Sequence, residues 1–363
     1  MRTGTANLPL HYGRTPRWLF ERMKLLAREI AIVVVEEFGT AEMLRRLADP
    51  FWFQAFGCVL GFDWHSSGVT TTVCGALKEG LKGLERELGL FVAGGKGATS
   101  RRTPQEIEAW GHELAVPPAR LVYASRMAAK VDNTALQDGY QLYHHVFVFD
   151  RGGRWCVVQQ GMNTATRYAR RYHWLSDSVR DFVCEPHAAI CCDRRGTPLN
   201  MVAAESEEAR RVSTLLSQEK PERLVGELKK LRSLDLPRRH ALLLEDIHPD
   251  RLKGIFLKTY ERQPEDFERL LGMEGVGPKT IRALSLIAEL VYGAKASFRD
   301  PVRYSFAHGG KDGHPYPVDR ATYDRSIQIL EKAIRQAKLG NREKLEAFGR
   351  LARWSGQPYA KRL

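Results

Sequence analysis

Apolar residues repeat every three or four positions near the start of the chain. This spacing runs from Arg17 to Phe38 and predicts one long helix with a buried face. We expect the helix to end at Gly39, because glycine is a common residue just past a helix end. Thr40 or Asp49 is a suitable N-cap for a short helix that follows. The beginning of the chain is therefore predicted to be helical.

The middle of the chain has the pattern of β-strands. Residues 140–149 and 155–160 are rich in β-branched and aromatic residues, and the Asp/Gly run at 150–153 between them is typical of a turn. These segments predict a β-hairpin. Residues 90–93 and 182–192 are further strand candidates.

Helical patterns flank these strands on both sides. Residues 67–84 predict a helix with Ser66 or Ser67 as its N-cap. Residues 206–230 are strongly charged and predict a surface helix, after which the last third of the chain is nearly all helix.

The change of pattern predicts two domains. A chain of 363 residues exceeds a single typical core. We place the boundary near 198–205, with a mixed α/β domain over 1–200 and an all-helical domain over 201–363. The predicted fold class is α+β.

Composition indicates the cellular compartment of the protein and the chemical class of its binding partner. The net charge of +13 attracts polyanions, although an arginine-rich proteome would also produce such a charge. The six cysteines are scattered without a repeated zinc-type spacing, and no signal peptide is present, which indicates reduced thiols in the cytoplasm. The longest apolar run, over 30–35, ends at Glu36, so no membrane span is expected.

The most informative segment is residues 270–280, Leu-Leu-Gly-Met-Glu-Gly-Val-Gly-Pro-Lys-Thr. It predicts a helix-hairpin-helix, in which glycines let the backbone approach DNA closely and Pro278 begins the second helix. The free N–H groups of that helix, beside Lys279, would bind a phosphate. The predicted DNA-binding residues are Gly275, Val276, Gly277, Lys279, Thr280, Arg282, Lys311 and Arg320.

This segment also resembles a known enzyme superfamily. The run 275–280, followed by Tyr292-Gly293 and then 317–319, is similar to the signature of the helix-hairpin-helix base-excision DNA glycosylases. The resemblance implies that Lys279 is the nucleophile that attacks the sugar C1′ and that Asp319 is the shared acid. It also implies a monovalent cation at the hairpin carbonyls. The four-cysteine motif of many relatives is absent, so no iron–sulfur cluster is expected.

The predicted chemistry suits these positions. A lysine amine is nucleophilic only when deprotonated, and the positive end of a helix favours that form. Asp319 would stabilise the positive charge that develops on the sugar, and a Schiff base would permit AP-lyase cleavage. The extruded base needs a pocket, which Tyr304, Phe306 and Tyr316 would help to line. The segment between Lys279 and Asp319 is about twice as long as is usual in this superfamily.

Other functions remain open from the sequence. The same hairpin pattern occurs where lysine only binds phosphate, in nucleases, ligases and polymerases. A metal-dependent nuclease is the second hypothesis, and a non-enzymatic DNA- or RNA-binding protein is the third. Candidate ligands for a divalent metal in the N-terminal domain are Asp63, His65, Asp132, Asp138 and His144. A turn, a helix cap or a strand histidine is the favoured explanation for each of them. Residues 94–97 lack the full P-loop pattern, which argues against nucleotide hydrolysis.

The N-terminal domain also offers a second basic set. Its members are Arg101, Arg102, Arg126, Lys130, Arg167, Arg170 and Arg171. The neighbouring aromatic residues would suit stacking on bases, or they could pack a core. They are Tyr168, Tyr172, His173 and Trp174.

Across its length the chain resembles an uncharacterised prokaryotic family, the domain of unknown function numbered seven-six-three. The resemblance is carried by residues 2–4 with 8–13, by 63–68, and by 306–315. That family label carries no activity. The sequence therefore predicts a cytoplasmic DNA-repair protein that binds duplex DNA, including damaged duplexes, with a glycosylase as the leading hypothesis. It does not indicate the lesion or the oligomeric state.

Overall fold

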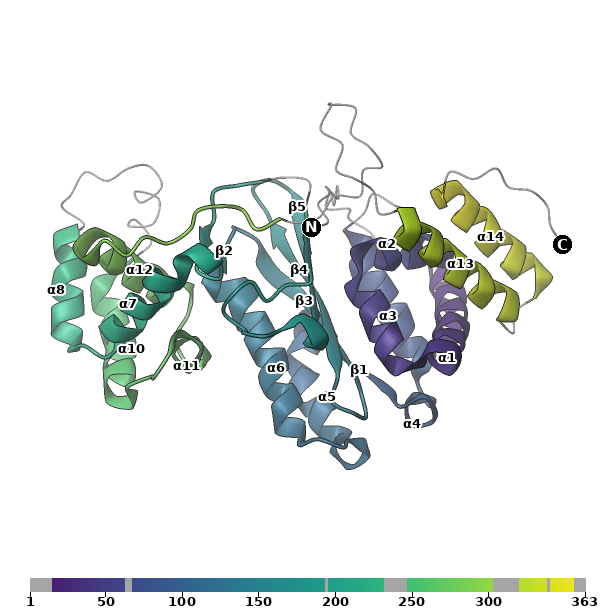
Figure 1. Cartoon of the computed structure of the whole chain (residues 1–363), viewed down its shortest axis with the longest axis horizontal. Helices are drawn as coiled ribbons and strands as arrows, with labels where there is room; N and C mark the ends of the chain where they lie inside the picture. The colour runs from purple at the N-terminus through teal and green to yellow at the C-terminus, as the bar shows by residue number, and fades with distance from the viewer. Residues whose placement is uncertain are drawn as a thin grey trace.

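The computed structural model describes residues 15–62, 67–192, 195–231, 247–302, 320–337 and 340–355. Figure 1 shows a central sheet with one group of helices on each side and further helices at both ends of the molecule. The predicted α+β fold is confirmed.

The central sheet has five strands in the order β1-β3-β4-β5-β6, and all its pairs are antiparallel. The strands are β1 Leu90–Lys96, β3 Gln141–Asp150, β4 Trp155–Asn163, β5 Tyr168–Leu175 and β6 Ala189–Cys191. Two short strands, β2 Leu136–Gln137 and β7 Leu199–Asn200, form a separate pair. The predicted hairpin is β3 and β4, in which Phe149 pairs with Trp155.

Each face of the sheet is covered by its own hydrophobic core (Figure 1). One core lies between the sheet and the helices α5 (Thr103–Ala109) and α6 (Pro118–Lys130), and it contains Phe147 and Trp174. It continues through Ile281 to α12 (Pro278–Tyr292), the second helix of the predicted helix-hairpin-helix. The other lies on the opposite face, contains Val148 and Val158, and includes residues of α1–α3. The strands alternate between these two cores, because successive side chains of a strand point to opposite faces.

The N-terminal helices follow their sequence signals closely. They are α1 Arg17–Ala48, α2 Pro50–Leu60, α3 Gly68–Leu81 and α4 Glu85–Leu88. Within α1, Gly39 has a non-helical backbone, so the predicted end appears as a kink. Asp49 caps α2, as predicted, by accepting from the N–H groups of Phe51 and Trp52. Of the other cap candidates, Thr40 donates its hydroxyl to Asp150, and Ser67 stands at the N-cap of α3 without a side-chain cap bond. Ser66 lies outside the described residues.

The middle and C-terminal helices complete the fold. Beside the sheet they are α5 Thr103–Ala109 and α6 Pro118–Lys130, and further along they are α7 Glu207–Ser217, α8 Pro221–Leu231, α10 Pro249–Arg262, α11 Phe267–Gly272, α12 Pro278–Tyr292, α13 Arg320–Gln336 and α14 Asn341–Ser355. A π-helical turn, Val131–Ala135, follows α6. Short 3-10 turns cover Gly97–Arg102, Gly111–Glu113, Ser176–Ser178 and Ala204–Ser206.

The last two helices lie apart from the hairpin. Buried residues of α13 and α14, including Leu330 and Leu351, belong to the core of α1–α3. Helix α13 contacts α1 and α14 contacts α2, and Figure 1 shows both at the α1–α3 end of the molecule. The predicted boundary near 198–205 stays a prediction.

Two strand predictions need correction. The segment 182–192 is a strand only over Ala189–Cys191, and β5 was not predicted at all. The reason is visible in β5, where Arg170 and Arg171 interrupt the apolar pattern although both side chains are buried. Their partners lie far away in sequence, so local propensity does not reveal the strand.

The cysteines and the helix lengths bear on two further expectations. All six cysteines are free thiols, five of them buried. Within the part of the chain that the structure describes, every helix is too short or too polar to cross a bilayer.

Candidate nucleic-acid interface

Two helices flank the glycine-rich turn, as the sequence predicts. α11 and α12 are joined by residues 273–277. Asp266 caps α11, since its carboxylate accepts a hydrogen bond from the N–H group of Arg269 at 2.7 Å. The turn is thus held between two well-defined helix ends.

The turn needs glycine at position 275. Its φ is +88°, a left-handed value that other residues adopt only with strain. A Cβ added there would also lie 2.7 Å from Cδ1 of Ile255 in α10. The next residue, Val276, is buried with 1% of its surface exposed. The turn therefore packs closely on α10, and its conformation is fixed before any ligand binds.

The start of α12 is open to an anion. Its N-cap residue, Gly277, has no side chain to cap the first turn, and Pro278 supplies no N–H group. Lys279 is exposed and has no hydrogen-bond or ion-pair partner among the described residues. The uncapped start of α12 thus combines the positive helix end with the exposed ammonium of Lys279, and both attract a phosphate.

The turn is also held by residues from the N-terminal half of the chain. Lys130, the last residue of α6, donates hydrogen bonds from Nζ to the carbonyl oxygens of Met273, at 3.4 Å, and Val276. Burial lowers the pKa of the Lys130 ammonium below its ordinary value.

A second clamp holds the first turn of α12. Gln137 Nε2 donates to the carbonyl oxygen of Pro278 at 2.9 Å, and Gln137 Oε1 accepts from Arg282 Nε at 2.7 Å. Arg282 is therefore engaged from one side by β2. The hairpin rests on the segment that runs from α6 through the π-helical turn to β2.

The predicted DNA-binding residues divide into three groups. The side chains of Val276 and Thr280 are buried, so only their backbones can meet a ligand. Gly275, Gly277, Lys279 and Arg282 are exposed or partly exposed. The residues outside the described part of the chain are Lys311, Asp319, the side chain of Arg320, and the proposed pocket residues Tyr304, Phe306 and Tyr316.

The proposed second basic face is wrong at its centre. Arg170 and Arg171 have 1% and 0% of their surfaces exposed, and Tyr172, His173 and Trp174 are equally buried. These aromatic residues pack the core, which is the other interpretation that the sequence allowed. The exposed arginines of this set are Arg101, Arg102, Arg126 and Arg167.

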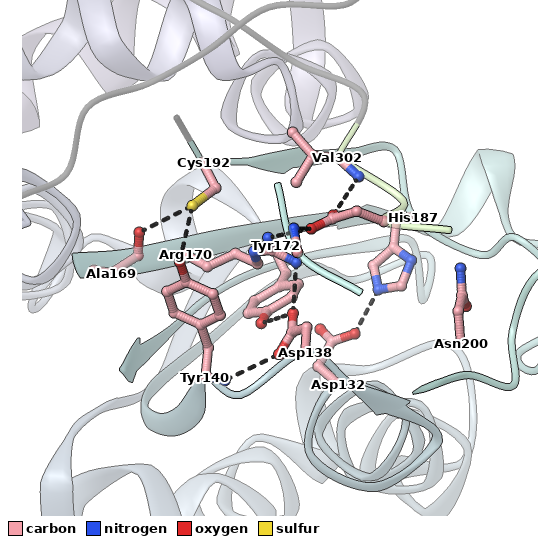
Figure 2. A network of polar contacts seen from close by, with 12 residues as sticks. Asp132, Asp138, Tyr140, Ala169, Arg170, Tyr172, His187, Cys192, Asn200 and Val302 are labelled. Carbon is pink, nitrogen blue, oxygen red and sulfur yellow. Dashed lines mark hydrogen bonds and ion pairs between the residues drawn. The ribbon is translucent and has the colours of Figure 1, made fainter. Parts of the chain in front are cut away.

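The buried Arg170 joins the sheet to the segment that follows α12 (Figure 2). Its guanidinium donates to Asp138 at 2.9 Å and to Asp300 at 2.8 Å, and all three side chains are at most 3% exposed. The Tyr172 hydroxyl donates to Asp138 at 2.7 Å. Arg170 thus forms a buried ion-pair link between Asp138 and Asp300, and we call these three residues the clasp.

The same face holds a buried acid and imidazole pair. Asp132, in the π-helical turn, contacts His187 (Figure 2). Its carboxylate also accepts from Trp174 Nε1 at 3.0 Å and from Gln159 Nε2. Gln159 Oε1 lies 2.7 Å from Nδ1 of His145. Three side chains therefore already bond to the Asp132 carboxylate.

The candidate metal ligands of the N-terminal domain do not gather at one point. Asp132 and Asp138 lie on the α5–α6 face of the sheet, because they bond to Trp174 and Tyr172 on that face. His144 lies on the other face, where it pairs with Gln160 of β4. Asp63 and His65 are outside the described residues. Within the described ranges no three His, Cys, Asp or Glu side chains are placed to hold a metal ion.

His144 is nevertheless unusual. A β-bulge at Tyr143 lets two residues of β3 face Gln160, and His144 is 1% exposed while neither ring nitrogen has a hydrogen-bond partner. Burial, with the charges of His145 and Lys96, lowers the pKa of His144 to about 3. It is a neutral imidazole that is buried without a hydrogen-bond partner.

Residues 94–97 have a structural explanation. Gly94 donates its N–H to Glu106 at 2.8 Å and accepts from Lys78 Nζ at 2.8 Å. A Cβ at Gly94 would lie 2.3 Å from the carbonyl oxygen of His145. This glycine is needed for strand packing, whether or not the segment also meets a phosphate.

Sequence reasoning missed the supports of the hairpin. The sequence points to Lys130 as part of a basic surface or of a polar site in the N-terminal domain, and it gives Gln137 and Asp300 no site. Their partners are separated from them by more than 100 residues, for example 143 between Lys130 and Met273. A single sequence offers no signal for such contacts.

Comparisons with known proteins identify a family and no activity. The model of a family described as "Protein of unknown function (DUF763)" matches residues 4–318. No curated protein and no solved structure matches the chain. The predicted family resemblance is confirmed, and the match extends from the N-terminal helices through the sheet to the hairpin.

Proposed function

The chain belongs to the DUF763 family, whose function is unknown, and we propose from its hairpin that it binds the backbone of duplex DNA in DNA repair. The observation that carries this proposal is Lys279, exposed and without a partner among the described residues at the uncapped start of α12. A lysine in such a place can bind a DNA phosphate, and its amine can also reach a sugar carbon.

The net charge supports the choice of a polyanion. A charge of +13 attracts DNA from a distance, independently of sequence. The support of the hairpin by Lys130 and Gln137 also favours binding, since a preorganised site loses little conformational entropy when it binds DNA. Free thiols agree with the reducing cytoplasm as the compartment where this binding occurs.

The proposed activity is base excision with Lys279 as nucleophile. The Lys279 amine attacks C1′ of a nucleotide flipped out of the helix, the glycosidic bond breaks, and its electron pair leaves with the base. The amine proton passes to the departing base, the sugar ring opens at the C1′–O4′ bond to give a Schiff base, and loss of a C2′ proton to solvent then expels the 3′ phosphate. Asp319 is the proposed acid that stabilises the positive sugar. Exposure of Lys279 supports this role, because a lysine locked in a buried ion pair could not attack.

Borohydride trapping tests the chemistry. We expect a covalent adduct between the protein and duplex DNA that contains damaged bases or abasic sites, and its loss in Lys279→Ala. Lys295→Ala is the control, because Lys295 is an exposed lysine beyond the other end of α12. Cleavage of undamaged DNA that is abolished by EDTA and survives Lys279→Ala would identify a metal-dependent nuclease instead. Binding without any product would identify a non-enzymatic DNA-binding protein.

A further inference from the structure

The hairpin turns two carbonyl oxygens toward a cation that the chain itself supplies. Lys130 Nζ bonds to the carbonyl oxygens of Met273 and Val276, which lie at the two ends of the tightest part of the turn. The N–H group of Val276 also bonds to the Met273 carbonyl oxygen, at 3.3 Å. The turn thus closes on itself around the ammonium.

The positive charge of the Lys130 ammonium is balanced by the carbonyl dipoles of Met273 and Val276. No carboxylate of the described residues forms an ion pair with Lys130, and its side chain is only partly exposed. Two carbonyl oxygens held close together repel each other, and a cation between them removes the repulsion. Hydrogen bonds from an ionised donor are also about twice as strong as neutral ones. Lys130 therefore fixes the shape of the turn more firmly than a neutral side chain would.

We propose that the Lys130 ammonium is a built-in cation of the hairpin, in the place that a free monovalent cation would otherwise occupy. Lys130 is thus a positioning residue for the phosphate-binding start of α12. Its structural role does not depend on the proposed DNA binding; only the effect on affinity rests on that function. Since the cation is part of the chain, the stability of the wild-type hairpin will not depend on potassium.

The neighbouring clamp makes this inference testable in a folded protein. Gln137 holds Pro278 and Arg282 independently of Lys130. Val276 and Ile281 remain buried in the shared core. Loss of the Lys130 ammonium should therefore loosen the turn without detaching α12.

The experiment compares melting temperatures at constant ionic strength in potassium chloride and in tetramethylammonium chloride, whose cation is too large for the turn. Wild type should melt at the same temperature in both salts. Lys130→Ala, which leaves room for a cation, should melt roughly 2–4 °C lower in tetramethylammonium chloride and recover in potassium chloride. Lys130→Met keeps the stem and should stay low in both salts. Lys279→Ala, the exposed lysine of the same hairpin, should melt like wild type.

Several results would overturn the proposal. A saturable rise of the wild-type melting temperature with potassium would show that a free cation still binds; this arm needs no variant. The proposal would also be overturned if Lys130→Ala melted at the wild-type temperature in tetramethylammonium chloride. It would equally be overturned if potassium chloride did not raise the melting temperature of Lys130→Ala. Duplex DNA affinity is measured in the same two salts. If wild type binds no DNA while the melting pattern holds, the proposed function fails and the role of Lys130 stands.

Discussion

Acidification should destabilise this protein through one unpartnered histidine. His144 is 1% exposed, and burial lowers its pKa to about 3, whereas its ordinary value is 6.5. Between these values the unfolded chain binds a proton that the folded chain does not. The stabilising contribution of the neutral imidazole is therefore fully present above pH 6.5 and is lost as the pH falls towards 3.

The size of the effect follows from the two pKa values. Lowering the pH from 7 to 5 should remove about 2 kcal/mol of unfolding free energy through His144 alone. Burial also lowers the pKa values of His145 and His173, so the wild-type protein will lose more in total. The His144→Leu variant isolates one contribution, because the other two histidines act in both proteins.

Urea unfolding at pH 7 and pH 5 measures this difference. The loss of unfolding free energy between the two pH values should be about 2 kcal/mol smaller in His144→Leu than in wild type. The same change at His248, which is exposed, should leave the pH dependence as it is in wild type. An equal loss in His144→Leu and wild type would refute the reasoning, since His144 would then take up its proton in the folded protein.

Two further predictions concern the turn and the clasp. Gly275→Ala should destabilise the protein by more than about 1 kcal/mol, because alanine is strained at φ +88° and its Cβ would clash with α10. Gly226→Ala, in an open position of a helix, should instead stabilise the protein by about 0.5–1 kcal/mol. Equal effects of the two changes in urea unfolding would contradict the assigned geometry. Arg170→Met leaves two buried carboxylates without their cation and should cost about 3–5 kcal/mol, while Arg211→Met on the surface should have little effect. A small cost for Arg170→Met would show that the clasp is open to water.

The sequence predicts those parts of the fold that local patterns determine. The β3–β4 hairpin follows from two β-rich runs around an Asp/Gly turn, and the kink in α1 follows from Gly39. Asp49 was predictable as a cap because its carboxylate bonds to N–H groups two and three residues away. In each case the interaction partners are neighbours in the chain.

The missed parts depend on distant partners. Strand β5 carries two arginines that would not be buried without Asp300, 130 residues from Arg170, and Gln54, 117 residues from Arg171. The hairpin itself was predictable from its glycines, but its support by Lys130 was not, because that contact spans two parts of the fold. Burial of charge is decided by such tertiary contacts, which a single sequence does not display.

The salt dependence of DNA binding by a matched pair of variants tests the central claim most directly. Lys279→Gln and Lys295→Gln remove the same charge from exposed lysines at opposite ends of α12. If the start of α12 binds a DNA phosphate, Lys279→Gln should lower the slope of log affinity against log salt by about 1, and Lys295→Gln should leave it unchanged. Identical slopes for wild type and both variants would contradict the claim that this hairpin binds DNA.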